Sequence, residues 1–432
     1  MNGLEDRPSM ENLRARDKKH LWHPLTQHKL NPDTLPIARA QGALLFDAAG
    51  KQYVDGISSW YTSVYGHCHP YILEKVMAGM QQLDQVVFSG FTHEPAIKLS
   101  EELIKVLPGN QQKLFFSDNG STATEIGIKM ALQYHHNKGQ KKRKVLLSFE
   151  EGFHGDTFGA MSASGLSVYN GPFEEFFIEV ERLAVPTPDN IEGLLKGLGD
   201  RLGKGDIAGF IYEPLVQGAA GMKMHDAQGL DHILALLQQN GALTIADEVM
   251  TGFGKTGRFF ASDHLEHMPD IICLSKALTA GLVPMGLTTC SEEVYSAFYS
   301  DDIAKGLFHG HTYSANPLAC TAALAALELL QSEEIQEGIR NIQGWHRAFE
   351  LEMGEHPKVA TTRSLGVIFA LELKTEMERY GEQRSRLFEH FMERGVYLRP
   401  LGNTIYILPP YIIDREQMER IYDAIRSALD WV

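Results

Sequence analysis

Short apolar runs alternate with amphipathic stretches along most of the chain. Runs rich in β-branched residues predict buried strands, and apolar residues that recur every three or four positions predict helices. Helices are predicted at 122–134 and 230–239, among others. The predicted strands lie at 114–118, 145–149, 207–211, 243–246 and 271–274. This alternation predicts an α/β fold in which a mostly parallel sheet is covered by helices on both faces.

The two ends of the chain show a different pattern, with hairpin and α+β signals. The elements predicted there are a hairpin at 43–47 and 52–55, a helix at 71–83, a long helix that begins after 318, strands at 367–373 and 405–408, and helices at 382–394 and 415–429. We therefore expect a large domain at 58–332 and a small α+β domain at 333–432, which the N-terminal segment 1–57 joins.

The composition is that of an ordinary globular protein, with 44% hydrophobic and 22% charged residues in 432. A net charge of -15 argues against nucleic-acid binding, which needs a basic surface. No apolar run is long enough to span a membrane, and the charged N-terminus lacks a signal-peptide core. The scattered cysteines predict reduced thiols and a cytoplasmic protein: Cys68, Cys273, Cys290 and Cys320.

Two histidine pairs could suggest a metal site. His67 and His69 flank Cys68, and His309 and His311 flank Gly310. No acidic or cysteine partners recur nearby at metal-ligand spacing. We therefore interpret both segments as turns or active-site loops and predict no metal.

A carboxylate and a lysine follow two of the predicted strands. Asp247 ends the run at 243–246, and Lys276 follows the run at 271–274. Catalytic groups collect at the carboxyl ends of parallel strands. A pyridoxal phosphate enzyme needs both groups, the lysine to hold the aldehyde as a Schiff base and the carboxylate to keep the pyridine nitrogen protonated. Strand ends also carry such residues merely to reach water, so the pair alone is modest support.

The segment 117–122 lies where a predicted strand meets a predicted helix. Its Gly120, Ser121 and Thr122 could bind a phosphate with helix N-terminal N–H groups and hydroxyls. Simple helix capping is the commoner meaning of such a run. Thr312 could also donate to a phosphate, and Phe153 could stack on a flat cofactor, although aromatic residues are usually core. Arg399 is either a structural ion pair or a carboxylate clamp.

Gly252, Gly254 and Gly257 match the dinucleotide-binding pattern of glycines. That motif should open a helix directly after its strand, whereas five residues intervene here and 258–264 is a poor helix start. A Walker A loop is excluded because Val249 occupies the first glycine position. We interpret these glycines as loop formers.

Larger blocks of sequence resemble a known family. The segments 243–257 and 269–276 resemble the signature of class III (omega-amino-acid type) pyridoxal phosphate aminotransferases. Further blocks resemble the members of that family that act in biotin synthesis: 20–24, 55–60, 152–161, 213–221, 398–402 and 408–410. They follow the family's order over nearly the whole chain. The resemblance implies a fold-type-I transferase with pyridoxal 5′-phosphate in the large domain and a homodimer with sites at its interface.

The resemblance also implies roles for individual residues. Lys276 would bind the cofactor covalently and Asp247 would pair with its ring nitrogen. The expected cofactor-binding residues are Gly120, Ser121, Phe153, Asp247, Lys276, His311 and Thr312, with Thr312 contributed by the partner subunit. The expected substrate-binding residues are Trp60, Phe153, Lys276, Gly310 and Arg399, with Arg399 on the substrate carboxylate. The implied reaction moves the α-amino group of S-adenosylmethionine to 8-amino-7-oxononanoate, which gives 7,8-diaminononanoate.

Four positions depart from the best-known form of these relatives. Leu25 and Phe153 stand where it has tyrosine, Tyr61 where it has a second tryptophan, and Lys255 where it has arginine. All four concern the substrate side, so they leave the reaction type intact and leave the amino donor open between S-adenosylmethionine and lysine. Other ω-amino-acid aminotransferases and an aminomutase of this fold are alternatives within the family. A nicotinamide oxidoreductase and a non-enzymatic binding protein are the alternatives outside it.

Overall fold

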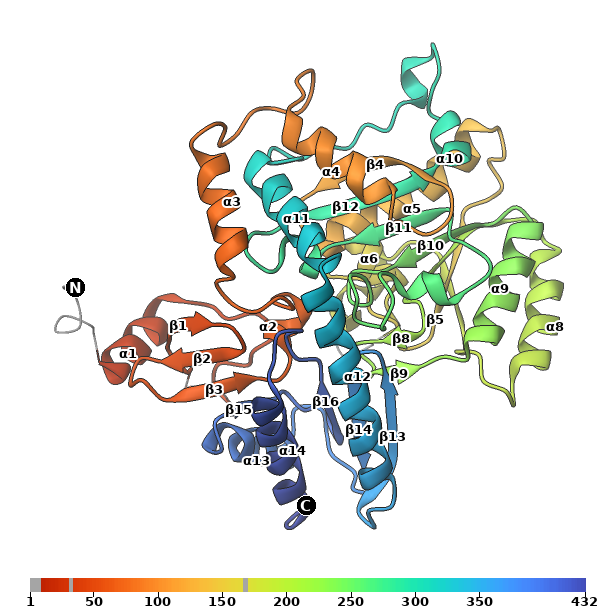
Figure 1. Ribbon diagram of the computed structural model, residues 1–432. Helices are drawn as coiled ribbons and strands as arrows, with labels where there is room; N and C mark the ends of the chain where they lie inside the picture. Colours follow the sequence, from red (N-terminus) through yellow and green to blue (C-terminus); the bar gives the residue numbers. More distant parts are fainter. Residues whose placement is uncertain (1–8, 31–33, 166–169) are drawn as a thin grey trace.

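A seven-stranded sheet forms the centre of the larger part of the molecule (Figure 1). The structure is a computed structural model that describes residues 9–30, 34–165 and 170–432. In spatial order the strands are β4 (Gln111–Ser117), β12 (Gly286–Ser291), β11 (Ile271–Leu274), β10 (Leu243–Asp247), β7 (Ile207–Tyr212), β5 (Val145–Phe149) and β6 (Val180–Leu183). From β11 to β6 all neighbours are parallel, and β12 is antiparallel to both of its neighbours. The mostly parallel sheet expected from the sequence is confirmed.

The five inner strands are buried along their whole length, which explains their nearly continuous apolar runs. The sequence pattern did not predict β12, because Thr288 and Thr289 interrupt its apolar run. Both hydroxyls are satisfied inside the core: Thr288 donates to the Ala123 carbonyl at 2.7 Å and Thr289 to the Gln111 side chain at 2.6 Å. Hydrogen bonding therefore makes these buried polar residues tolerable.

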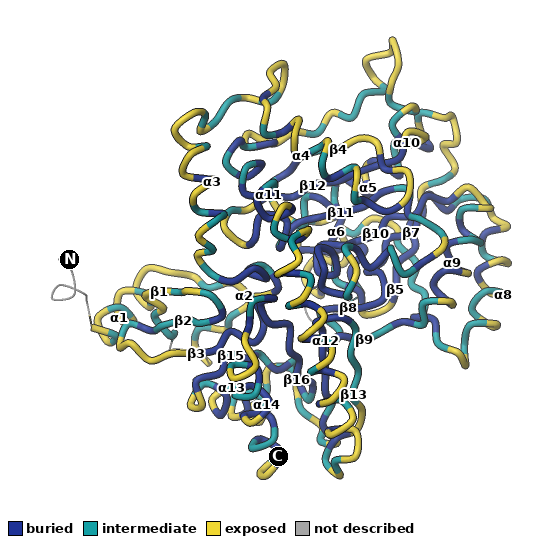
Figure 2. Tube along the Cα trace, viewed as in Figure 1, coloured by how far each residue is buried: buried dark blue, intermediate teal, exposed yellow. Residues whose placement is uncertain are grey.

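Helices cover both faces of the sheet, and each face has its own core. Ile271 and Cys273 of β11 point into one apolar cluster with α5 (Gly120–Asn137). Ile272 and Leu274 point into the other, which includes residues of α4, α9 and α11. Figure 2 shows this burial concentrated around the sheet. The remaining helices of this part are α3 (Pro70–Met80), α4 (Glu94–Ile104), α6 (Phe158–Ala163), α8 (Ile191–Leu202), α9 (Ala227–Gln239), α10 (Glu292–Ser296) and α11 (Pro317–Leu330).

A second region contains the C-terminal part and the N-terminal hairpin (Figure 1). Its three-stranded antiparallel sheet has the order β13 (Val359–Leu365), β14 (Ile368–Leu373) and β16 (Thr404–Ile407). A four-stranded sheet has the order β1 (Ile37–Gln41), β2 (Leu44–Asp47), β3 (Gln52–Asp55) and β15 (Val396–Tyr397). Because β15 pairs with β3 in parallel, the two ends of the chain meet in one sheet. The division at 57 and 332 stays a prediction, which this pairing supports.

The helices of the second region are α1 (Met10–His20), α12 (Glu333–Gly354), α13 (Glu382–Glu393) and α14 (Arg415–Leu429). The prediction of one long helix after residue 318 was wrong, since α11 ends at Leu330 and α12 begins at Glu333. Ser332 makes the break, because its hydroxyl accepts the Ile335 N–H and caps α12. Smaller elements are α2 (Ser58–Tyr61), β8 (Val216–Gln217), β9 (Lys223–Met224), and the 3₁₀ helices η1 (Gly171–Phe176), η2 (Ala261–His264), η3 (Lys276–Thr279) and η4 (Ile303–Lys305). No helix in the described ranges is long and apolar enough to cross a membrane.

Candidate active site

Lys276 and Asp247 come from neighbouring parallel strands. Asp247 ends β10 opposite Cys273 of β11, and Lys276 begins η3 just beyond β11. The Lys276 backbone has a φ of +49°, a left-handed value that a side chain rarely adopts. Burial lowers the pKa of Lys276 from its ordinary value, although the charges of Asp247 and Glu213 oppose that change. A less basic amine is more readily neutral, which is the form that reacts as a nucleophile.

The Asp247 carboxylate is buried and held at both oxygens. One oxygen accepts the Val249 N–H at 3.1 Å, and the other lies 2.8 Å from Nδ1 of His154. Since a carboxylate only accepts, Nδ1 of His154 is the donor. The other ring nitrogen of His154 is buried without a partner among the described residues. We had not predicted His154 as a site residue; its place in the 152–161 block was the available signal.

Glu213 is a further buried carboxyl group near this pair, and it was not predicted as a site residue. It accepts N–H groups from Phe153 at 3.1 Å and Gly218 at 3.0 Å. Burial is the main reason that its pKa rises to about 7, and the charge of Asp247 adds to the rise while His154 opposes it. Glu213 therefore changes protonation near neutral pH, beside the reactive lysine.

The segment that contains Gly120 and Ser121 forms a tight junction at the start of α5. Asn119 caps this helix, and its first N–H groups have no intrahelical acceptor. A Cβ on Gly120 would lie 2.7 Å from Cγ1 of Val249, so glycine is required for this close approach. Ser121 Oγ accepts the Thr157 N–H at 2.9 Å. The junction offers N–H donors and a helix dipole to an anion.

The loop with Gly310, His311 and Thr312 is exposed in the single chain. Nε2 of His311 lies 3.3 Å from the Asp118 carboxylate, which ties the loop to the junction before α5. The Thr312 carbonyl accepts from the Gln85 side chain at 2.9 Å. Neither contact brings Thr312 to Lys276 or Asp247, and its expected role in the partner subunit stays a prediction.

Trp60 and Arg399 lie together on the substrate side. The Arg399 guanidinium carbon is 4.6 Å from the centre of the Trp60 ring. No acidic side chain of the described residues lies within 4 Å of this guanidinium, so the structural ion pair considered above is absent there. Tyr61, the next residue along the turn, places its ring centre 5.4 Å from the Lys276 amine. An arginine that has a tyrosine partner, Tyr397, and no acidic partner in the described part of the chain thus stands next to the residues that surround Lys276.

Trp60 belongs to a run of four residues with left-handed backbone. The φ values of Ser58, Ser59, Trp60 and Tyr61 are 48°, 46°, 68° and 72°. Each non-glycine residue in this conformation costs roughly 1–2 kcal/mol. Such strain persists only where surrounding contacts compensate it, and it concentrates at functional sites.

Lys255, one of the four departures, is fully buried beside Lys276. Its amine donates to the Gly252 carbonyl at 3.0 Å. Burial chiefly, and then the charge of Lys276, lower the pKa of Lys255 well below its ordinary value. Leu25, a second departure, is exposed.

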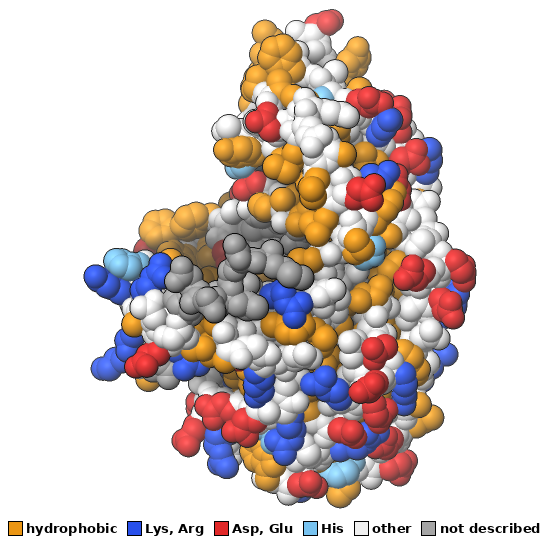
Figure 3. All heavy atoms as spheres, turned by 60° about the vertical axis from the view of Figure 1, so that its left-hand side comes forward, with side chains coloured by type: hydrophobic (Ala, Val, Ile, Leu, Met, Phe, Trp, Pro, Cys, Tyr) orange, Lys and Arg blue, Asp and Glu red, His pale blue; other side chains and the backbone are white. Residues whose placement is uncertain are grey.

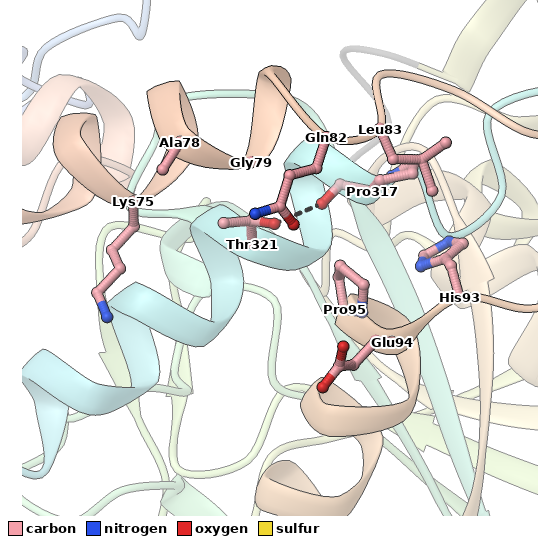
Figure 4. A pocket seen from close by; sticks show the side chains of 10 residues that line it. All are labelled: Lys75, Ala78, Gly79, Gln82, Leu83, His93, Glu94, Pro95, Pro317 and Thr321. Atoms are coloured by element: carbon pink, nitrogen blue, oxygen red, sulfur yellow. Dashed lines mark hydrogen bonds between the residues drawn. The ribbon is translucent and has the colours of Figure 1, made fainter.

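The glycine loop at 252–257 consists of turns and opens no helix, which agrees with its interpretation as a loop former. Gly252 donates to the Glu248 carbonyl and Gly254 has a φ of +94°. Among the described residues no group of three or more acidic, histidine or cysteine side chains could hold a metal. A cavity of about 370 Å³ among α3, α4 and α11 is lined by none of the predicted site residues (Figure 4). We do not assign it to the reaction.

Comparison with known proteins decides the family. The class-III aminotransferase family model matches residues 26–429. The chain belongs to the class-III aminotransferases. It is 43% identical over 421 residues to the adenosylmethionine-8-amino-7-oxononanoate aminotransferase of Synechococcus elongatus, which covers 95% of this chain and 98% of that protein. The enzyme of the same name from Helicobacter pylori is 35% identical and covers 97% and 98%.

Solved structures agree with this assignment. An adenosylmethionine-8-amino-7-oxononanoate aminotransferase from Methanocaldococcus jannaschii superposes with a TM-score of 0.91 at 31% identity, over 98% of this chain and 99% of that one. A PLP-bound amine transaminase from an uncultivated Pseudomonas species has a TM-score of 0.89 at 28% identity and covers 95% and 98%. This aminotransferase is a pyridoxal 5′-phosphate enzyme of fold type I, as the sequence predicted.

The residues at the site fit that cofactor. Lys276 is a buried amine that has no acidic side chain within 4 Å in the described part of the chain. Asp247 is a buried carboxylate oriented by His154, and the start of α5 offers N–H groups to a phosphate. A Cβ on Gly155 would lie 2.3 Å from Ser121 Oγ, so this part of the cradle also requires glycine. A reactive amine, a carboxylate that accepts from the ring nitrogen and an anion site are the three groups that pyridoxal phosphate requires.

Proposed function

We propose that this aminotransferase transfers the α-amino group of S-adenosylmethionine to 8-amino-7-oxononanoate, forming 7,8-diaminononanoate in biotin synthesis. The observation that carries the proposal is the Arg399 guanidinium against the Trp60 ring, 4.6 Å from its centre, with no acidic partner among the described residues. A bidentate arginine suits the acceptor's terminal carboxylate, and the aromatic face suits its aliphatic chain. Relatives with names that specify this reaction match the chain over nearly its full length.

The cofactor would be held by residues of the larger part. Lys276 would bind it covalently, Asp247 would pair with its ring nitrogen, Gly120 and Ser121 would hold its phosphate, and Phe153 would cover one face of its ring. Bound there, pyridoxal phosphate supplies an electron sink that stabilises negative charge on a substrate carbon. Asp247 matters because a buried charge-assisted hydrogen bond keeps the ring nitrogen protonated.

The protein's own part in the chemistry is proton transfer. Once the donor amine had taken its place, Lys276 would accept the proton from the donor's α-carbon and would pass that same proton to the C4′ carbon of the cofactor. Its lowered pKa favours the neutral amine that accepts a proton. In the second half-reaction Lys276 works in the reverse direction on the acceptor. Glu213, with a pKa of about 7, stabilises the protonated lysine between the two transfers.

Lysine is the second candidate donor, because three of the four departures weaken polar recognition of S-adenosylmethionine. Leu25 and Phe153 remove two hydroxyls from the substrate side, and Lys255 replaces a planar five-donor group with a single amine. Tyr61 still offers an aromatic face to a sulfonium or an adenine ring. We place S-adenosylmethionine first because each lost hydrogen bond weakens binding by only about 0.5–1.5 kcal/mol.

The proposal includes a cytoplasmic homodimer with sites at its interface. Large apolar side chains of the 299–313 region are exposed in the single chain, including Ile303 and Phe308 at about four-fifths. Figure 3 shows hydrophobic side chains gathered around a hollow on one face of the molecule. Covering such side chains is what a stable dimer does. It would also bring His311 and Thr312 to the partner's phosphate.

Product analysis tests the function. The holoenzyme is incubated with 8-amino-7-oxononanoate and either S-adenosylmethionine or lysine, and 7,8-diaminononanoate is measured by mass spectrometry. The proposal expects product with S-adenosylmethionine. Product with lysine alone would assign the second donor, and transfer only to other ω-oxo acids would refute the acceptor. Turnover of a single substrate without a donor would indicate an aminomutase.

A further inference from the structure

The left-handed turn at Ser58–Tyr61 is anchored by one buried carboxylate. Asp55 ends β3 and is fully buried. One of its oxygens accepts the Ile57 N–H at 3.3 Å. The other accepts the Ser59 hydroxyl and lies against Nε2 of His67, both at 2.8 Å. The Asp55 side chain thus holds the turn at two points: at Ile57, just before the left-handed residues, and at Ser59, among them.

The far side of the turn is anchored as well. The Ser58 hydroxyl donates to the Leu408 carbonyl at 2.8 Å, inside the core. His67 is itself fixed, because its backbone forms a two-way bridge with Gly42 at 2.8 and 3.0 Å. Asp55 therefore links the turn to a rigid histidine and not to solvent. These contacts are the compensation that four left-handed residues require.

The turn presents two rings to the site. Trp60 lies against Arg399, and Tyr61 lies between the Lys276 amine and the Tyr406 ring, whose centre is 5.8 Å away. Asp55 is also the register partner of Tyr397 in β15, two residues before Arg399. The Asp55 carboxylate therefore lies between β3 and β15, the two parallel strands after which Trp60 and Arg399 follow.

We propose that Asp55 and His67 are positioning residues for the acceptor. They hold the strained turn so that the Trp60 ring lies against the Arg399 guanidinium and keeps it oriented for a carboxylate. This inference rests on the proposed acceptor site. None of these contacts of Asp55 or His67 reaches Lys276, Asp247 or the start of α5 in the described structure, so we expect cofactor binding to stay intact and the acceptor half-reaction to depend on them more than the donor half-reaction.

Kinetics of the holoenzyme variants His67→Gln, Asp55→Asn and Ser59→Ala test the role. We expect KM for 8-amino-7-oxononanoate to rise about tenfold in His67→Gln and Asp55→Asn, and about threefold in Ser59→Ala, with donor half-reaction rates reduced clearly less than those of the acceptor half-reaction. His267→Gln is the matched control, since Asp231 and His267 form a pair of the same 2.8 Å length elsewhere. It should change neither quantity.

A substrate-free measurement separates this inference from the proposed function. In holoenzyme labelled with 5-fluorotryptophan, the ¹⁹F signal of Trp60 is assigned with Trp60→Phe. We expect that signal to shift or broaden in all three variants while those of Trp345 and Trp431 stay in place. An enzyme that ignores 8-amino-7-oxononanoate but shows this shift refutes the proposed acceptor alone. A Trp60 signal unchanged in folded Ser59→Ala and His67→Gln, or a donor half-reaction that falls as much as the acceptor's, overturns the positioning role. If the other variants fail to fold, Ser59→Ala decides.

Discussion

The cofactor side and the substrate side of this site are built from different kinds of structure. Asp247 ends one inner strand of the sheet and is buried, and half-buried Lys276 follows the neighbouring parallel strand. Trp60 and Arg399 follow β3 and β15, which come from opposite ends of the chain, and Trp60 stands on a strained turn. Of the four departures, Tyr61 lies on that turn, whereas Phe153 follows β5 and Lys255 lies in the loop after β10, beside Lys276. The comparison suggests a division of roles under the proposed function: the sheet would set the reaction type, and the place where the two chain ends meet would set which substrates bind.

Among the substitutions on the cofactor side, we expect Lys276→Ala to cause the largest loss of activity. Loss of the proton-transferring amine should reduce both half-reactions at least about 10⁴-fold. Borohydride treatment of the wild type should fix the cofactor on the peptide that contains Lys276, and the variant should lack this label. Lys255→Ala is the control, because it removes the neighbouring buried amine. Label on Lys255 in the wild type would contradict the assignment.

We expect Asp247→Asn to cause the second-largest loss of activity. A neutral amide cannot hold the ring nitrogen protonated, so we expect about a 10³-fold loss of rate in both half-reactions while the cofactor remains bound. Stopped-flow spectra of each half-reaction measure this loss. Asp231→Asn changes an aspartate that is also paired with a histidine, and it should leave both rates unchanged. A loss confined to one half-reaction would show that Asp247 acts on a substrate.

Glu213→Gln probes a carboxyl group at the boundary between the two sides. The pKa of Glu213 is raised in the folded chain to about 7 from an ordinary 4.5, so the folded state binds more protons than the unfolded state between those values. Its contribution to stability is therefore full below about pH 4.5 and is lost as pH rises through 7. Relative to wild type, the variant should gain about 3 kcal/mol in free energy of unfolding between pH 4.5 and 8. Urea unfolding of the cofactor-free proteins at both pH values measures the gain; a constant difference would mean that Glu213 does not titrate there.

Arg399→Ala tests the substrate side, because it should affect the acceptor half-reaction and spare the donor half-reaction. Loss of a charge-assisted carboxylate clamp should raise KM for 8-amino-7-oxononanoate about 10- to 100-fold, with the donor half-reaction nearly normal. Arg399→Lys should not restore affinity, because a point charge lacks the planar pair of donors. If Arg399→Ala slows both half-reactions equally, Arg399 is structural and the clamp lies elsewhere.

Sequence patterns predicted the cofactor side better than the substrate side. Apolar runs located β5 and β11 at their observed bounds, because strands buried on both faces need continuous apolar residues. They missed β12, whose threonines are satisfied by hydrogen bonds that depend on tertiary contacts. The turn at Ser58–Tyr61 contains no glycine to signal its left-handed backbone.

The roles of individual site residues depended on tertiary structure in the same way. Glu213 and His154 acquire their properties from burial and from the partners that folding brings to them, neither of which a sequence pattern encodes. Lys276 and Asp247 were predictable because the ends of parallel strands meet at one edge of a sheet. Whether Arg399 was paired could be answered only from the structure, where no acidic side chain of the described residues lies near it.

The most direct test of the account is a two-step single-turnover experiment on the holoenzyme. S-adenosylmethionine alone is added first, and absorption spectra follow conversion of the cofactor from its aldehyde form to its amine form. 8-Amino-7-oxononanoate is then added, and the spectrum and product are recorded. We expect conversion in the first step and its full reversal in the second, with one 7,8-diaminononanoate formed per site. Conversion by lysine but not by S-adenosylmethionine would contradict the proposed donor. If 8-amino-7-oxononanoate does not reverse the conversion, the central claim that the site around Trp60 and Arg399 selects this acceptor is wrong.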